Sequence, residues 1–190
     1  MRIITGTARG CKLKTPKGQD TRPTADRIKE SLFNILGSEV CERTVLDLFA
    51  GTGNLGLEAL SRGALHAVFI DQSTDRLIHE NAEHTRLLDK SEIFRGDVFS
   101  FMKRLQHSGR MFDMVFCDPP YNKMLWQRAL VLLDTMNLLK TGAIVIVEHA
   151  KEDCSMPELD NLKIIRNQVY GSTTQISILK KSGVLEGEIL

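Results

Sequence analysis

From Thr44 onward the chain alternates short apolar runs with longer amphipathic segments, and this alternation limits the possible folds more than any other feature. Such alternation is typical of a parallel sheet with helices on both faces, because each crossover helix packs on the sheet between two strands. The last two apolar runs are joined only by Gly171 and Ser172, which predicts an antiparallel edge. We therefore predict an α/β, Rossmann-like fold with strands at 44–49, 66–70, 93–95, 112–117, 143–148, 162–169 and 173–180, and helices at 55–61, 74–88, 99–107 and 123–133.

The first 37 residues precede this pattern. Segments 2–5 and 12–15 alternate weakly and are separated by glycines, which predicts a β-hairpin. Segment 24–36 has apolar residues at helical spacing, with Thr24 as a plausible N-cap and Gly37 as a stop. We expect three parts: a basic N-terminal hairpin and helix at 1–37, a main domain at 38–183, and a frayed tail at 184–190.

Positive charge is concentrated in the N-terminal part. Residues 1–30 hold eight Lys/Arg against three Asp/Glu, although the formal net charge of the whole chain is only +1. A local basic excess is what a polyanion-binding segment needs, although short basic stretches are often ordinary solvated surface. The candidate cations are Arg2, Arg9, Lys12, Lys14, Lys17, Arg22, Arg27 and Lys29.

Length and composition exclude several classes of protein. A chain of 190 residues with 42% apolar content suits one domain with a small appendage. No apolar stretch is long enough to span a bilayer, and the start lacks the apolar region of a signal peptide, so we expect a cytoplasmic protein without a membrane partner. The four cysteines include no C-x-x-C pair, and His79 and His84 do not have metal-binding spacing. We therefore expect neither a disulfide framework nor a metal site.

The run Asp118-Pro119-Pro120-Tyr121 follows the apolar segment 112–117 and combines a carboxylate, a rigid backbone and an aromatic ring. The lone pair of a planar amino group is delocalised into its π-system, so the group is a poor nucleophile unless a site localises that pair. Asp118 and the carbonyl of Pro119 could each accept one N–H, while Tyr121 could stack on the ring. The run therefore predicts a site that activates a planar amino group, although by itself it could also be a turn that ends a strand.

Segment 47–56 leaves the first of these strands and contains the G-x-G-x-x-G spacing of a dinucleotide fingerprint. Its glycines allow a cofactor to approach the backbone closely. The discriminating residue is Asp47, an acid near the strand end without a nearby Lys or Arg. This carboxylate would repel a pyrophosphate, but it would attract the amino group and the sulfonium of S-adenosylmethionine. We therefore predict S-adenosylmethionine rather than NAD as the cofactor.

Two further acids follow the next two predicted strands and so belong to the same edge of the sheet. Asp71 could accept hydrogen bonds from both ribose hydroxyls, and Asp97 could accept one from the adenine amino group. Either acid alone could equally be a helix cap, because a helix is predicted after each of them. Three acids at three successive strand ends favour a nucleoside site.

Together these motifs resemble class I S-adenosylmethionine-dependent methyltransferases, and residues 118–121 resemble the subset that methylates exocyclic amino groups. Segments 22–27, 32–36, 48–51 and 56–64, with Glu30, narrow the resemblance to the RsmD family of bacterial 16S ribosomal RNA guanine-N2 methyltransferases. The similarity extends from about Arg2 to Lys180. Lys29, Ser31 and Cys117 depart mildly from the family pattern and are not among the inferred catalytic groups.

The resemblance implies a seven-stranded sheet and methylation of one guanine N2 in 16S ribosomal RNA, within the assembled or assembling small ribosomal subunit. We expect a monomer. The catalytic set implied is Asp118, Pro119, Pro120 and Tyr121. The cofactor contacts implied are Asp47, Phe49, Ala50, Gly51, Gly53, Asp71, Gln72, Asp97 and Val98. From the basic segment we expect RNA contacts by Arg9, Lys12, Lys14, Arg22 and Arg27.

Other functions remain open at this point. A DNA adenine-N6 methylase shares the motif at 118–121, although 190 residues contain no recognisable target-recognition domain. A protein-glutamine methyltransferase more often has Asn in the position of Asp118. A non-catalytic nucleoside-binding or RNA-binding module could also have this fold, but the chain retains every polar group expected of an enzyme.

Overall fold

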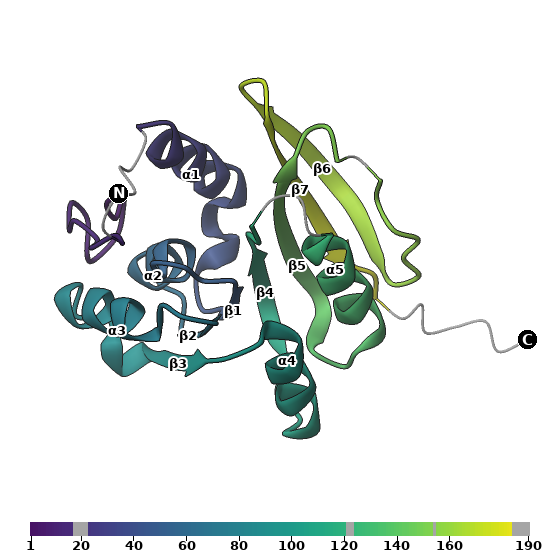
Figure 1. The fold of residues 1–190 in the computed structure, drawn as a ribbon, viewed down its shortest axis with the longest axis horizontal. Helices are drawn as coiled ribbons and strands as arrows, with labels where there is room; N and C mark the ends of the chain where they lie inside the picture. The colour runs from purple at the N-terminus through teal and green to yellow at the C-terminus, as the bar shows by residue number, and fades with distance from the viewer. Residues whose placement is uncertain (17–22, 121–123, 154, 184–190) are drawn as a thin grey trace, which may run out of the picture.

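The computed structural model describes residues 1–16, 23–120, 124–153 and 155–183. Within them, seven strands form one sheet in the order β3-β2-β1-β4-β5-β7-β6 (Figure 1). The strands are β1 (Thr44–Leu48), β2 (His66–Asp71), β3 (Ser91–Arg95), β4 (Phe112–Cys117), β5 (Leu139–Ala150), β6 (Leu162–Tyr170) and β7 (Thr174–Lys181). The helices are α1 (Pro23–Leu36), α2 (Asn54–Ser61), α3 (Asp75–His84), α4 (Val98–His107) and α5 (Leu125–Thr135), with short 3-10 turns η1 (Gly37–Val40) and η2 (Leu88–Lys90).

The strand pairing confirms the predicted fold class. Strands β1 to β5 pair in parallel, and β7 pairs antiparallel with both β5 and β6, so that the closing pair forms one end of the sheet with β6 outermost. Strand order runs one way from β1 through β2 to β3 and the other way from β1 through β4 to β5. The carboxyl ends of β1 and β4 therefore lie at a topological switch point, where open α/β sheets bind their ligands.

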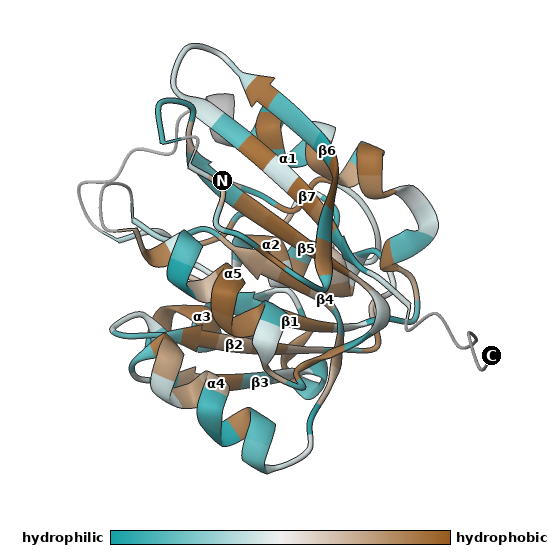
Figure 2. Ribbon diagram, turned by 90° about the vertical axis from the view of Figure 1, so that its right-hand side faces the viewer, coloured by the Kyte–Doolittle hydropathy of each residue, from teal (hydrophilic) through white to brown (hydrophobic). Residues whose placement is uncertain are grey.

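Two apolar cores cover the two faces of the sheet. Helices α1, α2 and α3 pack on one face, where the ring of Phe33 in α1 lies 5.6 Å from that of Phe116 in β4. Helices α4 and α5 pack on the other, with Met102 and Leu130 among the buried residues. Figure 1 shows these two groups of helices on opposite sides of the strands, and Figure 2 shows the central strands as the most hydrophobic part of the fold.

The predicted N-terminal hairpin is wrong in its extent. Residues 1–13 pair through one antiparallel bridge, between Arg2 and Lys12, rather than through two strands. The reason is that helix α2 takes backbone donors that a second strand would have used: the N–H groups of Ile4 and Thr5 donate to the carboxylate of Glu58 over 2.8 and 3.0 Å. We call residues 1–16 the N-terminal arm. The predicted functional boundary at residue 37 stays a prediction.

The element boundaries differ from the predicted ones mainly at two places. Helix α3 ends at His84 rather than continuing to residue 88, because Arg86 has a φ of +59° and the N–H of Leu87 donates to the carbonyl of Ala82 over 2.8 Å. Strand β5 is longer than predicted and extends to Ala150. The predicted tail at 184–190 lies outside the described residues. Among the helices that the structure describes, none combines the length and apolarity that crossing a membrane requires.

Candidate active site and nucleic-acid interface

The glycine-rich loop connects β1 to α2 at the switch point. Phe49 and Gly51 have φ angles of +59° and +56°, and Gly53, which precedes α2, has a φ of +77°. This conformation suits glycine but costs Phe49 about 1 kcal/mol. The N–H of Ala50 donates to the carbonyl of Ile70 over 3.1 Å, and that of Gly53 to the carbonyl of Ala50 over 2.7 Å. The loop is therefore a tight, preformed turn at the carboxyl end of β1.

Asp47 lies near the end of β1 and is only 2% exposed. Its Oδ2 accepts a hydrogen bond from the backbone N–H of Gly56 in the first turn of α2 over 2.9 Å. A Cβ at Gly56 would lie 2.3 Å from a ring carbon of Phe69, so only glycine fits there. The contact of Asp47 in the structure is thus with the helix that carries the loop, and its predicted contact with the cofactor stays a prediction.

Burial raises the pKa of the Asp47 carboxyl to about 8; the Gly56 N–H opposes this rise and the Asp71 carboxylate adds to it. Because the folded-state pKa lies above the unfolded value, the folded state binds more protons between about pH 4 and pH 8, and the free energy of unfolding falls as the pH rises through this window.

The variant Asp47→Asn keeps an acceptor for the N–H of Gly56 but cannot titrate. We expect it to remove a dependence of the free energy of unfolding on pH of up to about 1.4 kcal/mol per pH unit. Denaturant unfolding across this pH range measures it. A slope unchanged relative to wild type, or equal loss in the exposed control Asp89→Asn, would contradict the assignment.

Asp71 ends β2 and makes contacts in two directions. Its Oδ2 accepts from the N–H of Gly51 over 3.0 Å, while its Oδ1 accepts from the N–H groups of Ser73 and Thr74 over 2.9 and 3.1 Å. It therefore supports the start of α3 and ties β2 to the glycine loop. A carboxylate has about four acceptor positions, so a ribose hydroxyl could still bind beside these partners. Gln72, the next predicted contact, is exposed.

Asp97 is the N-cap of α4. Its Oδ1 accepts from the backbone N–H and the hydroxyl of Ser100 over 2.9 and 2.8 Å. Val98 is buried, and the next residue, Phe99, packs edge-on against the ring of Phe49 at 6.1 Å. The guanidinium of Arg128 in α5 covers the Phe99 ring at 3.9 Å. The contacts of Asp97 are those of a helix cap, and its role toward adenine stays a prediction.

The Asp-Pro-Pro-Tyr motif begins directly after β4. Asp118 and Pro120 are exposed, whereas Pro119 is buried. Tyr121 lies outside the described residues. The motif therefore begins at the switch point, where the buried Pro119 anchors the turn.

Glu148 is a site residue that the sequence reasoning missed. Cys117 in β4 pairs with Val147 in β5, so the residues that follow them, Asp118 and Glu148, lie side by side on one face of the sheet. Asp47 pairs with Phe116, two residues before Asp118, and so belongs to the same face. The predicted strand 143–148 ended on this glutamate, and the pattern of acids at strand ends was the signal that could have identified it.

Repulsion among these carboxylates affects the protonation of Asp118. Desolvation, followed by the negative charges of Glu148 and Asp47, raises the pKa of the Asp118 carboxyl well above its usual range. Asp118 retains an exposed surface, so water screens part of this repulsion. A ligand that donates hydrogen bonds to both neighbouring carboxylates would relieve the repulsion.

The cations predicted to contact RNA have different surroundings. Arg9, Lys12 and Arg27 are exposed and form no ion pair with any described residue. Lys14 is also exposed but pairs with Glu80 over 2.8 Å, and Arg22 lies outside the described residues. A cavity of about 420 Å³ between the arm and α1 is lined by Arg2, Ile3, Ile4, Arg9, Gly10, Asp26, Arg27 and Glu30. A second, of about 580 Å³, shares Arg27 and Glu30 with it and adds Ser31, Asn34, Ile35, Arg166 and Gln168.

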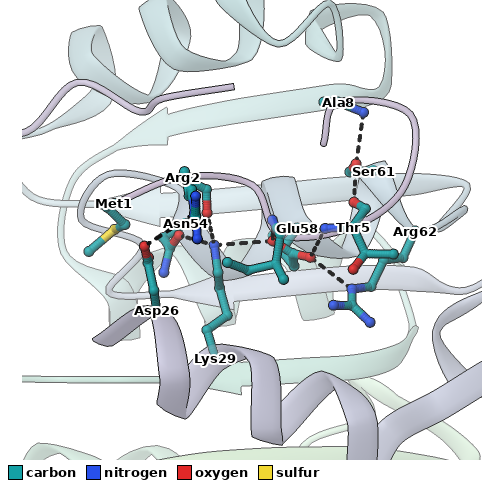
Figure 3. A network of polar contacts seen from close by, with 12 residues as sticks. Met1, Arg2, Thr5, Ala8, Asp26, Lys29, Asn54, Glu58, Ser61 and Arg62 are labelled. Carbon is teal, nitrogen blue, oxygen red and sulfur yellow. Dashed lines mark hydrogen bonds and ion pairs between the residues drawn. The ribbon is translucent and has the colours of Figure 1, made fainter. Parts of the chain in front are cut away.

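Lys29 was wrongly counted among the candidate cations for a polyanion. Its side chain is 1% exposed, and its Nζ lies 3.1 Å from Oε2 of Glu58, which is itself fully buried (Figure 3). Burial lowers the pKa of Lys29, and the Glu58 charge opposes this shift. Helical spacing could have revealed its position, because Lys29 shares a helix face with Leu32, Phe33 and Leu36.

The residues that the structure describes include no group of three or more His, Cys, Asp and Glu side chains placed to hold a metal ion.

Comparisons with known proteins give close matches along the whole fold. Residues 1–179 match the family model described as Conserved hypothetical protein 95. The chain is 35% identical to the putative rRNA methyltransferase YlbH of Bacillus subtilis, over 96% of this chain and 100% of the relative. It is 35% identical to ribosomal RNA small subunit methyltransferase D of Escherichia coli K12, over 90% and 85% of the two chains. The solved structure of the putative methyltransferase yhhF from Escherichia coli superposes with a TM-score of 0.82 at 32% identity, covering 96% and 98% of the two chains.

Proposed function

Because this chain belongs to the family described as Conserved hypothetical protein 95, we propose that it transfers a methyl group from S-adenosylmethionine to the exocyclic N2 of a guanine in 16S ribosomal RNA. The matches confirm the resemblance to the RsmD family. Methylation of ribosomal RNA with S-adenosylmethionine is supported by the names of the relatives. The choice of guanine N2 as the methylated atom is proposed from the residues of the site.

The glycine loop and the acids beside it suit the cofactor. S-adenosylmethionine supplies an electrophilic methyl group on a positively charged sulfur. Gly51 is half-buried and leaves its part of the loop backbone accessible, whereas Gly53 is buried against Ile78 and Leu57. Asp71 keeps acceptor capacity toward a ribose while holding Gly51 in place. Asp97 could accept from the adenine amino group with the oxygen that does not cap α4. Asp47 supports the same loop and contributes negative charge near it.

The feature that favours guanine is the adjacency inferred for Asp118, directly after β4, and Glu148, near the carboxyl end of β5. The Watson–Crick edge of guanine presents N1–H beside the N2 amino group, so it offers hydrogen-bond donors to both carboxylates. Adenine presents an unprotonated N1 beside its N6 amino group, and a carboxylate would repel that lone pair. Asp118 is therefore proposed to accept from N2–H and Glu148 from N1–H. Adenine is rejected because its unprotonated N1, a hydrogen-bond acceptor, would face the carboxylate of Glu148.

Catalysis in this arrangement is mainly positioning. Asp118 and the carbonyl of Pro119 would hold the N2 hydrogens and direct the nitrogen lone pair toward the methyl group. A neutral aromatic amine is too weak an acid for Asp118 to deprotonate beforehand, so the proton leaves during or after transfer, to Asp118 or to water. The base must leave its stack to reach the sheet edge, and Tyr121 is proposed to replace that stacking.

One experiment tests the function directly. The protein is incubated with labelled S-adenosylmethionine and, separately, with naked 16S RNA, assembled small subunits and DNA, and the modified base is then mapped. We expect label on N2 of one guanine in the RNA. Label on adenine N6, or label only in DNA, would reject the proposal in favour of an adenine methylase.

Glu148→Gln tests the guanine assignment at the level of one side chain. We expect kcat/KM for the mapped guanine to fall about 10- to 100-fold, because a charge-assisted hydrogen bond to N1–H is lost. With 2-aminopurine at the target position, which keeps the amino group but lacks N1–H, the fall should be smaller. The acid limb of the pH–rate profile should also move to lower pH, since removing the Glu148 charge lowers the pKa of Asp118.

The exposed Glu152→Gln provides the control for Glu148→Gln, because it removes the same charge in the segment after β5 without touching the strand end. Equal losses with guanine and 2-aminopurine would mean that Glu148 does not contact N1.

The arm is proposed to contact RNA phosphates through Arg9 and Lys12. We expect the double variant Arg9→Gln, Lys12→Gln to weaken RNA binding and to reduce the slope of log K against log salt by about 1 to 2, since each phosphate contact contributes about 0.7 to 0.9. Fluorescence anisotropy across a salt series measures this slope. Lys90→Gln with Lys103→Gln, two exposed lysines on other elements, is the matched control. If the slope of log K against log salt were equal in the two double variants, the arm would be ordinary solvated surface that does not contact RNA phosphates.

A further inference from the structure

The glycine loop of the proposed cofactor site is held by side chains that also hold the N-terminal arm. The first is Asn81 of α3, which is fully buried. Its Nδ2 donates to the carbonyl of Thr52 in the loop over 2.9 Å and to the carbonyl of Lys14 in the arm over 3.1 Å. Its Oδ1 accepts from the N–H of Lys14 over 2.7 Å. Both amide hydrogens of Asn81 are thus used, one on the loop and one on the arm.

The second is Lys29 of α1, on the other side of the loop. Its Nζ donates to Oδ1 of Asn54, where the loop enters α2, and to the carbonyl of Arg2 in the arm, each over 2.6 Å. It also pairs with Glu58. Figure 3 shows the Lys29 ammonium group among these partners, which come from the arm and from α2. An ammonium group has three hydrogens, and three partners are present.

The arm depends on these contacts because its own backbone pairing is limited to one bridge and the hydrogen bonds of Ile3, Gly10 and Leu13 around it. Glu58 accepts from two arm N–H groups, and Ser61 in α2 accepts from the N–H of Ala8 over 3.0 Å and donates to the carbonyl of Thr5 over 2.6 Å. In addition, the hydroxyl of Thr52 in the loop lies 3.4 Å from the sulfur of Met1. The arm and the loop therefore share supports at Thr52 and Asn54, where the loop enters α2. Displacement of the arm removes hydrogen-bond partners from the side chains that hold this part of the loop.

We propose that Asn81 and Lys29 are positioning residues that make the N-terminal arm a structural component of the cofactor site, so that the arm sets the affinity for S-adenosylmethionine. The idea rests on the proposed function, in which the loop binds this cofactor and the arm binds RNA. By thermodynamic linkage, RNA that orders the arm then tightens binding of the cofactor, and the cofactor tightens binding of RNA by the same factor. Neither residue needs to touch the cofactor for this effect.

Asn81→Ala provides the direct test, with the full-length protein and S-adenosylhomocysteine as the probe. We expect calorimetry without RNA to show a Kd raised about tenfold, and kinetics to show a raised KM for S-adenosylmethionine with kcat at saturation changed by less than about threefold. The control is Thr85→Val, at the buried polar C-cap of the same helix, whose hydroxyl donates to the α3 carbonyls of Asn81 and Ala82. Unchanged cofactor affinity in folded Asn81→Ala, or equal loss in Thr85→Val, would overturn the proposal.

Lys29→Arg and Asn54→Ala provide a second test that does not depend on Asn81→Ala folding. Lys29→Arg keeps a multivalent cation and should stay within about threefold of wild-type affinity, whereas Asn54→Ala removes one link and should weaken cofactor binding. An Asn54→Ala protein with wild-type affinity would count against the Lys29 link.

A third measurement tests the coupling to RNA. It compares the Kd for ribosomal RNA with and without S-adenosylhomocysteine. Wild type should bind RNA at least about fivefold more tightly with the probe, and Asn81→Ala should bind with a ratio near one. A ratio of one in wild type, or an unchanged ratio in Asn81→Ala, would overturn the coupling. Because the RNA-free affinity measurement does not involve the target base, a failed mapping experiment rejects the proposed function without deciding whether Asn81 positions the loop.

Discussion

Asp118→Ala is expected to lower kcat for methyl transfer by about a thousandfold or more while leaving the Kd for S-adenosylhomocysteine nearly unchanged. The physical reason is that Asp118 acts on the amino group and not on the cofactor: without its carboxylate, the nitrogen lone pair stays delocalised in the base and the N–H loses its acceptor. Single-turnover methyl transfer to the mapped substrate measures the first quantity, and calorimetry measures the second.

Two further variants sharpen this result. Asp118→Asn keeps an oxygen that can accept N–H but removes the charge, so its kcat should lie between those of wild type and Asp118→Ala. Asp89→Ala, an exposed acid in η2, should retain full activity. Parallel loss of methyl transfer and cofactor binding in Asp118→Ala would instead assign the residue to the cofactor site or to the fold.

Lys29→Met is expected to destabilise the protein by about 3 to 5 kcal/mol. The substitution leaves the fully buried carboxylate of Glu58 with Arg62 as its remaining charged partner, at 2.8 Å, and removes the donor to Arg2 and Asn54. Removing one partner of a buried ion pair costs far more than the pair contributes, because the other charge stays desolvated. Urea unfolding followed by circular dichroism measures the change, with the m-value checked for two-state behaviour.

The matched control is Lys14→Met, which breaks the exposed pair between Lys14 in the arm and Glu80 in α3. Because solvent screens this pair, no measurable change in stability is expected. If both variants lost the same stability, the buried network of Figure 3 would be no more important than a surface ion pair.

The local sequence was sufficient to predict the fold class, most of the elements and the cofactor. Alternating apolar runs predicted the strands of the sheet, because burial on both faces requires continuous apolar residues whatever the neighbouring strand is. The glycines at 51, 53 and 56 and the run from Asp118 to Tyr121 were recognisable because a tight turn and a rigid acceptor pair each depend on adjacent residues. These features predicted S-adenosylmethionine as cofactor and a planar amino group as methyl acceptor, but they fit adenine and guanine equally well.

Lys29 shows where local reasoning failed. Its charge suggested solvent and a polyanion, whereas its environment depends on Glu58 and Asn54, which belong to a different helix. The hairpin failed for a related reason: the residues had adequate strand character, but α2 offered stronger hydrogen-bond partners than a second strand. Competition of this kind cannot be evaluated before the elements are assembled.

By itself, the sequence determined the α/β fold class, the turn that accommodates a cofactor and the presence of an acceptor-rich motif after β4. Only the tertiary structure decided that Glu148 stands beside Asp118, since the register between β4 and β5 sets which residues are neighbours across the sheet. Likewise, only the packing of the arm on α2 and α3 joined it to the glycine loop through Asn81 and Lys29. Turns and apolar periodicity arise from interactions a few residues apart, whereas the base selectivity and the coupling proposed for this protein depend on contacts between segments that meet only on folding.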